Sequence, residues 1–228
     1  MKSLLLSVII WAGLLANVAS AADPSIDRLL NKLPAPEKFV DPAQNDPLAK
    51  QMLAALKAKN LGTALDASRR LANKYPKSFG AQAIHGLIAL GMRQFAEASA
   101  AYRKALAIRS GFSAAYLGIA LAEASQGHYR VALSNFQQIT RIAPKADIGW
   151  IGSSACAEKL GMRQESLNYA RRATAAAPSS PGAWYQLARE EGLSGDKQAA
   201  AKAFAHANQL QGKTRTTNRP RGGSTQRQ

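Results

Sequence analysis

The sequence predicts an all-α protein in which about five helix-turn-helix repeats stack into a solenoid. Three sets of residues recur at one fixed spacing: Tyr116, Trp150 and Trp184; Gly127, Gly161 and Gly195; and the small residues Ala64, Ala98, Ala132, Ser166 and Ala200. Self-similarity at a fixed period of this size is the signature of a repeat architecture. Because one repeat cannot bury its own apolar face, stacked neighbours must share a continuous core.

The composition agrees with a folded chain and favours anionic partners. The 228 residues are 46% hydrophobic and 19% charged, which excludes a wholly disordered chain. Thirty Lys and Arg stand against fourteen Asp and Glu, so the net charge is +16. This excess favours anionic partners or surfaces. The single cysteine, Cys156, excludes an intramolecular disulfide and a cysteine-based metal site.

Residues 1–21 have the pattern of a secretory signal peptide. A basic Lys2 precedes an apolar run from Leu4 to Leu15, and small residues surround the expected cleavage point after Ala21. Cleavage there would place the mature chain in the periplasm. Two alternatives remain open, an uncleaved anchor in the inner membrane and secretion from the cell. The anchor stays open because no charged residue lies between Lys2 and Asp23.

Residues 22–45 are expected to be a proline-rich linker with one short amphipathic helix. Four prolines exclude a single long helix. The apolar residues of one short stretch fall on one helical face: Ile26, Leu29, Leu30 and Leu33. A helix this short is not stable alone in water. It must therefore dock either on the first repeat of this chain or on a partner.

The repeat domain is expected over residues 46–212, with repeats at about 45–78, 79–112, 113–146, 147–180 and 181–212. In the third repeat, the first helix ends at Gly127, which offers a left-handed cap, and Pro144 stops the second helix. Asp46 and Ser180 each precede a proline, a pair typical of a helix start. One helical turn after each small residue comes a position that is mostly a large ring, filling the gap between neighbours: Ser68, Tyr102, Phe136, Ala170 and Phe204.

This pattern resembles the tetratricopeptide repeat. The third repeat matches the motif best, at Tyr116, Ala120, Gly127, Tyr129, Ala132, Phe136 and Pro144. The resemblance covers about residues 45–212 and is weakest in the first and last repeats, as is usual for end repeats. It implies a right-handed superhelix in which the first helices line the concave face and the second helices form the convex face.

The resemblance implies a partner-binding groove on the first helices. Its expected lining is apolar: Leu53, Leu87, Leu90, Leu117, Leu121, Ile148, Ile151 and Tyr185. An apolar groove favours a hydrophobic or helical segment of a protein partner. Two other interpretations stay open, that these residues pack between helices or that residues 26–33 cover them. The groove positions offer no donor for a carboxylate, so a receptor for chaperone tails is not expected.

The second helices and the tail carry candidate residues for an anionic partner: Arg69, Arg70, Arg103, Lys104, Arg171, Arg172, Arg215, Arg219 and Arg221. Residues 213–228 contain no acid, and their polar composition predicts a disordered basic tail. An anionic envelope polymer or a lipid surface would suit these charges. The alternative interpretation is that the charges form a solvated face that binds no partner. Nucleic acid is disfavoured because the tail has no aromatic residues to stack on bases.

The sequence contains none of the common catalytic motifs. The three histidines, His85, His128 and His206, are isolated in the sequence, and no HExxH motif is present. Gly111–Phe112–Ser113 lacks the second glycine of a nucleophile elbow. Gly212–Lys213–Thr214 resembles the end of a phosphate loop but follows an expected helix rather than a strand. We therefore expect no enzyme activity, no metal and no cofactor.

The sequence thus favours a periplasmic scaffold that binds a hydrophobic or helical segment of a cell-envelope protein and assists the assembly of a complex. The alternative is an electrostatic binder of an anionic envelope polymer or lipid, acting through the basic convex face and tail. Self-association through an end repeat is a third hypothesis, because the end of a solenoid exposes an unfinished core.

Overall fold

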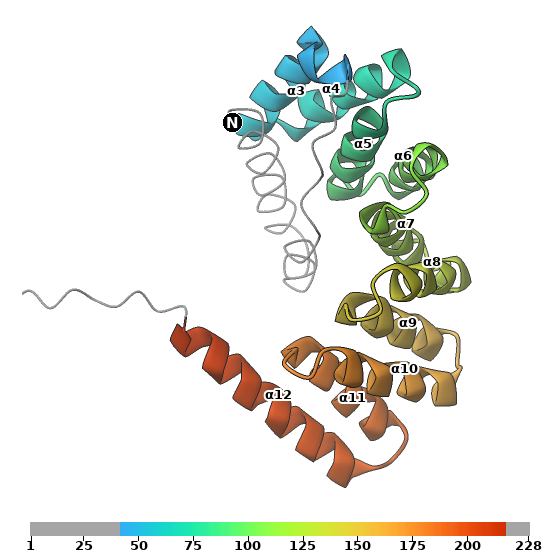
Figure 1. Cartoon of the computed structure of the whole chain (residues 1–228), viewed down its shortest axis with the longest axis vertical. Coiled ribbons are helices and arrows are strands. Elements are labelled where there is room, and N and C mark those ends of the chain that lie inside the picture. Colours follow the sequence, from blue (N-terminus) through green and yellow to red (C-terminus); the bar gives the residue numbers. More distant parts are fainter. Residues whose placement is uncertain (1–41, 218–228) are drawn as a thin grey trace, which may run out of the picture. The chain divides into compact units, whose positions relative to one another are not determined.

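The computed structural model describes residues 42–217 and is all-α over that range (Figure 1). A short 3-10 turn, η1 (Pro42–Asn45), precedes ten α-helices. They are α3 (Pro47–Lys57), α4 (Leu61–Lys74), α5 (Phe79–Gly91), α6 (Phe95–Ile108), α7 (Ser113–Ser125), α8 (Tyr129–Ile142), α9 (Asp147–Lys159), α10 (Arg163–Ala176), α11 (Pro181–Leu193) and α12 (Lys197–Thr217). The predicted fold class is confirmed.

The helices form five consecutive pairs, which we number repeat 1 (α3, α4) to repeat 5 (α11, α12). The chain divides into two compact bodies at Ala143 and Pro144. The N-terminal body (residues 42–143) holds repeats 1 to 3, and the C-terminal body (residues 144–217) holds repeats 4 and 5. Inside each body, the second helix of a repeat also packs on the first helix of the repeat that follows it.

The helix starts follow the predicted caps. The Asp46 carboxylate accepts a hydrogen bond from the Leu48 amide at 2.9 Å, with Pro47 as the first helical residue. Ser180 and Pro181 begin α11 in the same way. An N-cap acceptor satisfies one of the amides that a helix start leaves without a partner. Both predicted starts are therefore confirmed.

The turn inside every repeat passes through a left-handed residue. Successive positions are one repeat period apart, and all five have positive φ: Lys59 (57°), Arg93 (59°), Gly127 (81°), Gly161 (75°) and Gly195 (94°). The three glycines were expected from the sequence. Lys59 and Arg93 occupy the same conformation, although a side chain disfavours it. The position within the repeat, rather than the presence of a glycine, thus identifies this turn.

The core of the N-terminal body is built around Tyr102 in α6. Its side chain is 2% exposed, and its ring lies between Gly86 of α5 and Gly118 of α7. A Cβ atom on Gly118 would overlap the Tyr102 ring, so this contact requires glycine. The ring predicted to fill the gap between neighbouring repeats does so here.

The small-residue row lies where the paired helices approach each other. Ala64, Ala98, Ala132 and Ser166 are fully buried, and only Ala200 in repeat 5 is half-buried. In the C-terminal body, the Ser154 hydroxyl of α9 donates to the Ser166 carbonyl of α10 at 2.9 Å, and Ser166 donates to the Ser154 carbonyl at 2.8 Å. Cys156 of α9 is also buried, and burial raises its pKa to about 11.

The end of the repeat domain differs from the prediction. Helix α12 continues to Thr217, whereas the tail was expected to begin at residue 213. No proline follows until Pro220, and one glycine at 212 is not enough to stop a helix. The signal peptide, the 26–33 helix and residues 218–228 lie outside the described residues. No helix within residues 42–217 is long and apolar enough to span a bilayer.

Candidate interaction surfaces

The structure separates the expected groove residues into two groups. Leu87, Leu117 and Ile148 are buried, so the interpretation of these three as open contact residues requires correction. A first helix packs against its own second helix and against the next repeat, which leaves only a narrow strip accessible. The other five residues remain half-buried: Leu53, Leu90, Leu121, Ile151 and Tyr185.

The accessible apolar strip of the N-terminal body includes a residue that sequence reasoning missed. Leu56 is half-buried, packs against the same core cluster as Leu53 and Leu90, and lies one repeat period before Leu90. The repeat period could therefore have identified it. We call Leu53, Leu56, Leu90 and Leu121 the first-helix row, because they come from α3, α5 and α7.

The two members of each basic doublet on the second helices make different contacts. The first arginine of each doublet is bonded to a carboxylate: Arg69 to Glu97 at 3.0 Å, Arg103 to Glu123 at 2.6 Å, and Arg171 to Glu191 at 2.9 Å. The Arg171–Glu191 pair repeats the Arg103–Glu123 pair two periods later in the sequence. These arginines therefore tie a second helix to the repeat that follows it.

The second members of the doublets, Arg70, Lys104 and Arg172, are exposed. The Arg172 guanidinium lies 5.4 Å from the centre of the Trp150 ring, a cation–π contact. Arg215 falls in the last turns of α12, and Arg219 and Arg221 lie outside the described residues. About half of the predicted basic convex surface is thus committed to internal ion pairs.

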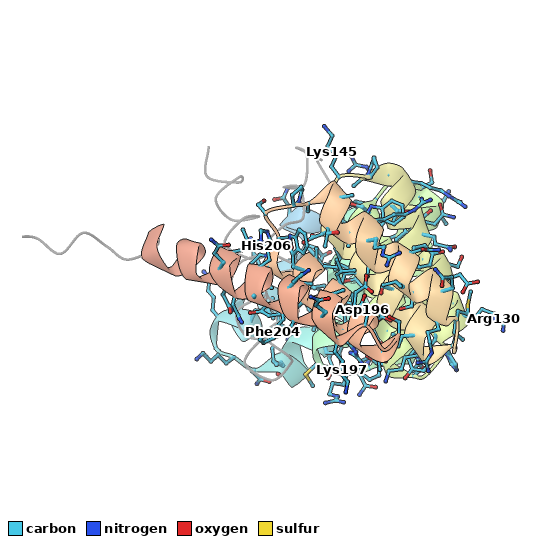
Figure 2. All side chains as sticks on the ribbon, turned by 90° about the horizontal axis from the view of Figure 1, so that it is seen from below. Arg130, Lys145, Asp196, Lys197, Phe204 and His206 are labelled. Atoms are coloured by element: carbon cyan, nitrogen blue, oxygen red, sulfur yellow. The ribbon has the colours of Figure 1, made fainter. Side chains whose placement is uncertain are left out.

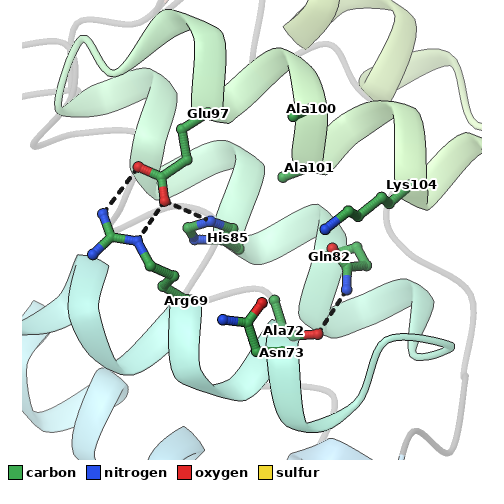
Figure 3. A pocket seen from close by; sticks show the side chains of 9 residues that line it. All are labelled: Arg69, Ala72, Asn73, Gln82, His85, Glu97, Ala100, Ala101 and Lys104. Atoms are coloured by element: carbon green, nitrogen blue, oxygen red, sulfur yellow. Dashed lines mark hydrogen bonds and ion pairs between the residues drawn. The ribbon is translucent and has the colours of Figure 1, made fainter.

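A polar pocket of about 210 Å³ lies between α4, α5 and α6 (Figure 3). At its centre, His85 Nε2 is 3.1 Å from Glu97 Oε1, and the Ser68 hydroxyl is 3.0 Å from His85 Nδ1. His85 and His128 are isolated along the sequence, but each lies beside a carboxylate in the structure, and His128 Nδ1 is 2.9 Å from Glu123 Oε2. Ser68, His85 and Glu97 come from three different helices, so no local motif reveals the cluster.

The Ser68–His85–Glu97 chain resembles an activated nucleophile only in connectivity. Ser68 is 1% exposed and its hydroxyl donates to the Leu65 carbonyl at 2.8 Å, so no substrate can reach it. Burial lowers the pKa of His85, and the positive charges of Arg69 and Lys104 oppose protonation further, against the pull of Glu97. The hydrogen bond from Arg69 lowers the pKa of Glu97. The cluster is a buried polar contact that links α4, α5 and α6.

The C-terminal body has a polar cluster of its own beneath α11. The Gln186 amide donates to the Ser154 hydroxyl at 3.0 Å and to Glu190 Oε1 at 2.8 Å. Burial raises the pKa of Glu190, and the nearby charge of Glu158 raises it further. Across the described residues, no group of three or more His, Cys, Asp or Glu side chains has an arrangement suited to a metal ion.

The last repeat carries an open apolar hollow that sequence reasoning did not identify. It lies between α11 and α12 and is lined by Tyr185, Ala188, Arg189, Ala200, Ala201 and Phe204. Phe204 is 53% exposed and its ring centre is 5.6 Å from that of Tyr185. Figure 2 shows Phe204 on α12, with Lys197 on the same helix. We call this surface the repeat 5 hollow.

Comparisons with known proteins agree with this architecture. Residues 80–111 match the family model of the tetratricopeptide repeat. The crystal structure of MamA is similar with a TM-score of 0.66 at 12% identity, covering 72% of this chain and 96% of MamA. The chain has a tetratricopeptide repeat fold. Domains of this fold are scaffolds for protein–protein interaction and are typically not catalytic.

Other tetratricopeptide repeat structures show the same similarity. MamA from Desulfovibrio magneticus RS-1 gives a TM-score of 0.66 at 14% identity, covering 75% of this chain and 96% of that one. YrrB, described as a TPR protein with an unusual peptide-binding site, gives 0.60 at 15% identity, covering 75% of this chain and 88% of YrrB. No curated protein sequence matches the chain.

Proposed function

We propose that this protein is an exported periplasmic scaffold that binds a hydrophobic or helical segment of a cell-envelope protein and assists assembly of its complex. The first-helix row carries the proposal. Its four leucines come from three successive repeats, are all half-buried, and bear no charge. An amphipathic helix binds such a strip through apolar residues at helical spacing. The signal-peptide pattern of residues 1–21 supports the compartment.

Photo-crosslinking in the cell tests this binding directly. A photoreactive residue at position 121 should give a discrete adduct with another protein. The same residue at position 142 is a matched control, since Ile142 is also accessible and apolar but lies on the second helix α8. An adduct confined to residues 26–33 of the same chain would mean that the row is filled internally, and would refute the scaffold function of this surface.

The variant Leu121→Asp should abolish the adduct and leave the helical content unchanged, with Ile142→Asp as its matched control. A loss of helicity in Leu121→Asp would place Leu121 in the core and refute its assignment to the row. The export part of the proposal has its own measurement. The mass of the protein recovered from the periplasm should correspond to a chain that begins at Ala22, and recovery of the intact chain from the membrane would contradict cleavage.

The exposed cations Arg70, Lys104 and Arg172 favour a second function, the binding of an anionic envelope polymer or lipid. Exposed charges are screened over about 10 Å at 0.1 M salt, so this binding should weaken steeply as salt rises. Binding at the apolar row should depend much less on salt. Removing residues 218–228 should weaken only the electrostatic binding, which distinguishes the two functions.

A further inference from the structure

The repeat 5 hollow is the counterpart of surfaces that a following repeat covers within each body. Phe204 lies three repeat periods after Tyr102 in the sequence. Tyr102 is 2% exposed because α7 of the next repeat places Gly118 against its ring, whereas Phe204 is 53% exposed. The two rings share one position in the repeat, and only the neighbour differs.

Two alanines of the hollow show the same relationship to the preceding repeat, while Ala188 is itself buried. Ala200 is half-buried and Ala201 is exposed, whereas Ser166 and Leu167, one repeat period earlier, are 0% and 8% exposed. Helix α11 covers that surface, with Gln186 bonded to Ser154. The hollow therefore continues the interface between repeats and has the form of a seat for one more first helix.

A second copy of this chain is a poor occupant for that seat. Position 50 of α3 corresponds to Gly118 of α7, the residue that contacts the ring of the preceding repeat. In repeat 1 this position is the exposed Lys50, which would bring a charged side chain against Phe204. The net charge of +16 on each copy also opposes association.

The charge of the hollow indicates the chemistry of its occupant. Its charged lining residue, Arg189, is already bonded to Glu158 at 2.8 Å, and the other lining residues carry no charge. Arg103 and Arg171 each bind a glutamate of the next first helix, but the equivalent position in α12 is Ala205, so that contact is not repeated here. We propose that the repeat 5 hollow binds one α-helix of a partner protein through an apolar face, with a glycine or alanine opposite Phe204.

This surface is separate from the first-helix row, so either surface can fail without the other. A suitable probe is a synthetic peptide with the sequence of α7 (Ser113–Ser125), held helical by a staple on its exposed face. The peptide supplies Gly118 for the ring, and Glu123 is its one charged side chain. Its affinity for the full mature chain can be measured by fluorescence anisotropy.

We expect the peptide to bind the natural chain and to lose at least about tenfold in affinity to Phe204→Glu, because a central aromatic anchor dominates such contacts. The matched control is Ile142→Glu, which should bind normally. A peptide in which leucine replaces the residue equivalent to Gly118 should bind at least about tenfold more weakly. Phe204→Leu should retain most of the affinity, and circular dichroism should show unchanged helicity in every variant.

Three results would overturn the proposal. The first is an absence of binding up to millimolar peptide, and the second is equal binding to the natural chain and to Phe204→Glu. The third is a dimer in sedimentation experiments that Phe204→Glu dissociates, since a second copy would then be the occupant. None of these results affects crosslinking from position 121, which tests the first-helix row.

Discussion

The first and last repeats share the same repeat period, but the outward position of the first is charged and that of the last is an exposed aromatic ring. In repeat 1, the outward position of α3 is the exposed Lys50, and the cap residue Asp46 accepts hydrogen bonds from Lys74 at 2.6 Å and Tyr75 at 2.8 Å. In repeat 5, Phe204 is exposed and Ala200 is only half-buried. A repeat therefore does not bury its own ring position; the following repeat buries it.

The largest expected effect compares the ring position inside the stack with the same position at its end. Tyr102→Ala should cost about 3–5 kcal/mol of unfolding free energy, because it empties a packed site between α5 and α7. Phe204→Ala should cost less than about 1 kcal/mol, because half of its ring already contacts water. Urea denaturation of both variants measures the difference. Equal losses would show that Phe204 is already covered, and the comparison would fail.

The left-handed turn position allows a second and smaller comparison. Gly195 in repeat 5 has φ of 94°, and Gly195→Ala should cost about 1–2 kcal/mol because a Cβ atom strains that conformation. Lys59 in repeat 1 has φ of 57° and already bears this strain, so Lys59→Gly should gain up to about 1 kcal/mol. Thermal melts can measure both changes. A loss of stability in Lys59→Gly would mean that the lysine side chain offsets the strain.

The smallest expected effect compares one carboxyl group from each end repeat as the pH changes. Hydrogen bonding to Lys74 lowers the pKa of Asp46 to about 2, so its stabilising contribution is complete above its ordinary pKa and disappears as the pH falls towards 2. Asp46→Asn should therefore lower the Tm at pH 7, with a difference that shrinks between about pH 4 and about pH 2.

Glu190 should behave in the opposite way. Burial raises its pKa, so its ionised form destabilises the folded state above the raised pKa and has no effect at low pH. Glu190→Gln should raise the Tm at pH 7 by a few degrees at most and leave it unchanged well below pH 4. Melts of both variants across this pH range supply the measurement. Parallel pH profiles for Asp46→Asn and Glu190→Gln would contradict the assigned environments.

Much of the fold was predictable because the repeat is a local pattern. The repeat period located the helix pairs and the three glycine turns, and the following prolines located the caps at Asp46 and Ser180. It even fixed the conformation of Lys59 and Arg93, whose residue types argue against it. The end of α12 was not predictable from the period, because a last helix has no following repeat to limit it.

The interaction surfaces were only partly predictable. Sequence position identifies the face of a helix but not how closely the next helix approaches it, so Leu117 became core while Leu121 stayed accessible. Clusters such as His85 with Glu97 depend on contacts between separate helices, which no spacing along the chain reveals. The exposure of Phe204 depends on a neighbour that is absent from the sequence pattern after residue 212.

The buried thiol of Cys156 makes the opening of the C-terminal body measurable as a rate of thiol modification. With its pKa raised to about 11, the side chain is almost wholly in the unreactive thiol form at neutral pH, and a modifying reagent must wait for α9 to separate from its neighbours. Because this is the chain's one cysteine, the rate of labelling counts the openings of a single helix. Occupancy of the repeat 5 hollow by a partner would then slow this labelling, and the measurement needs no engineered cysteine.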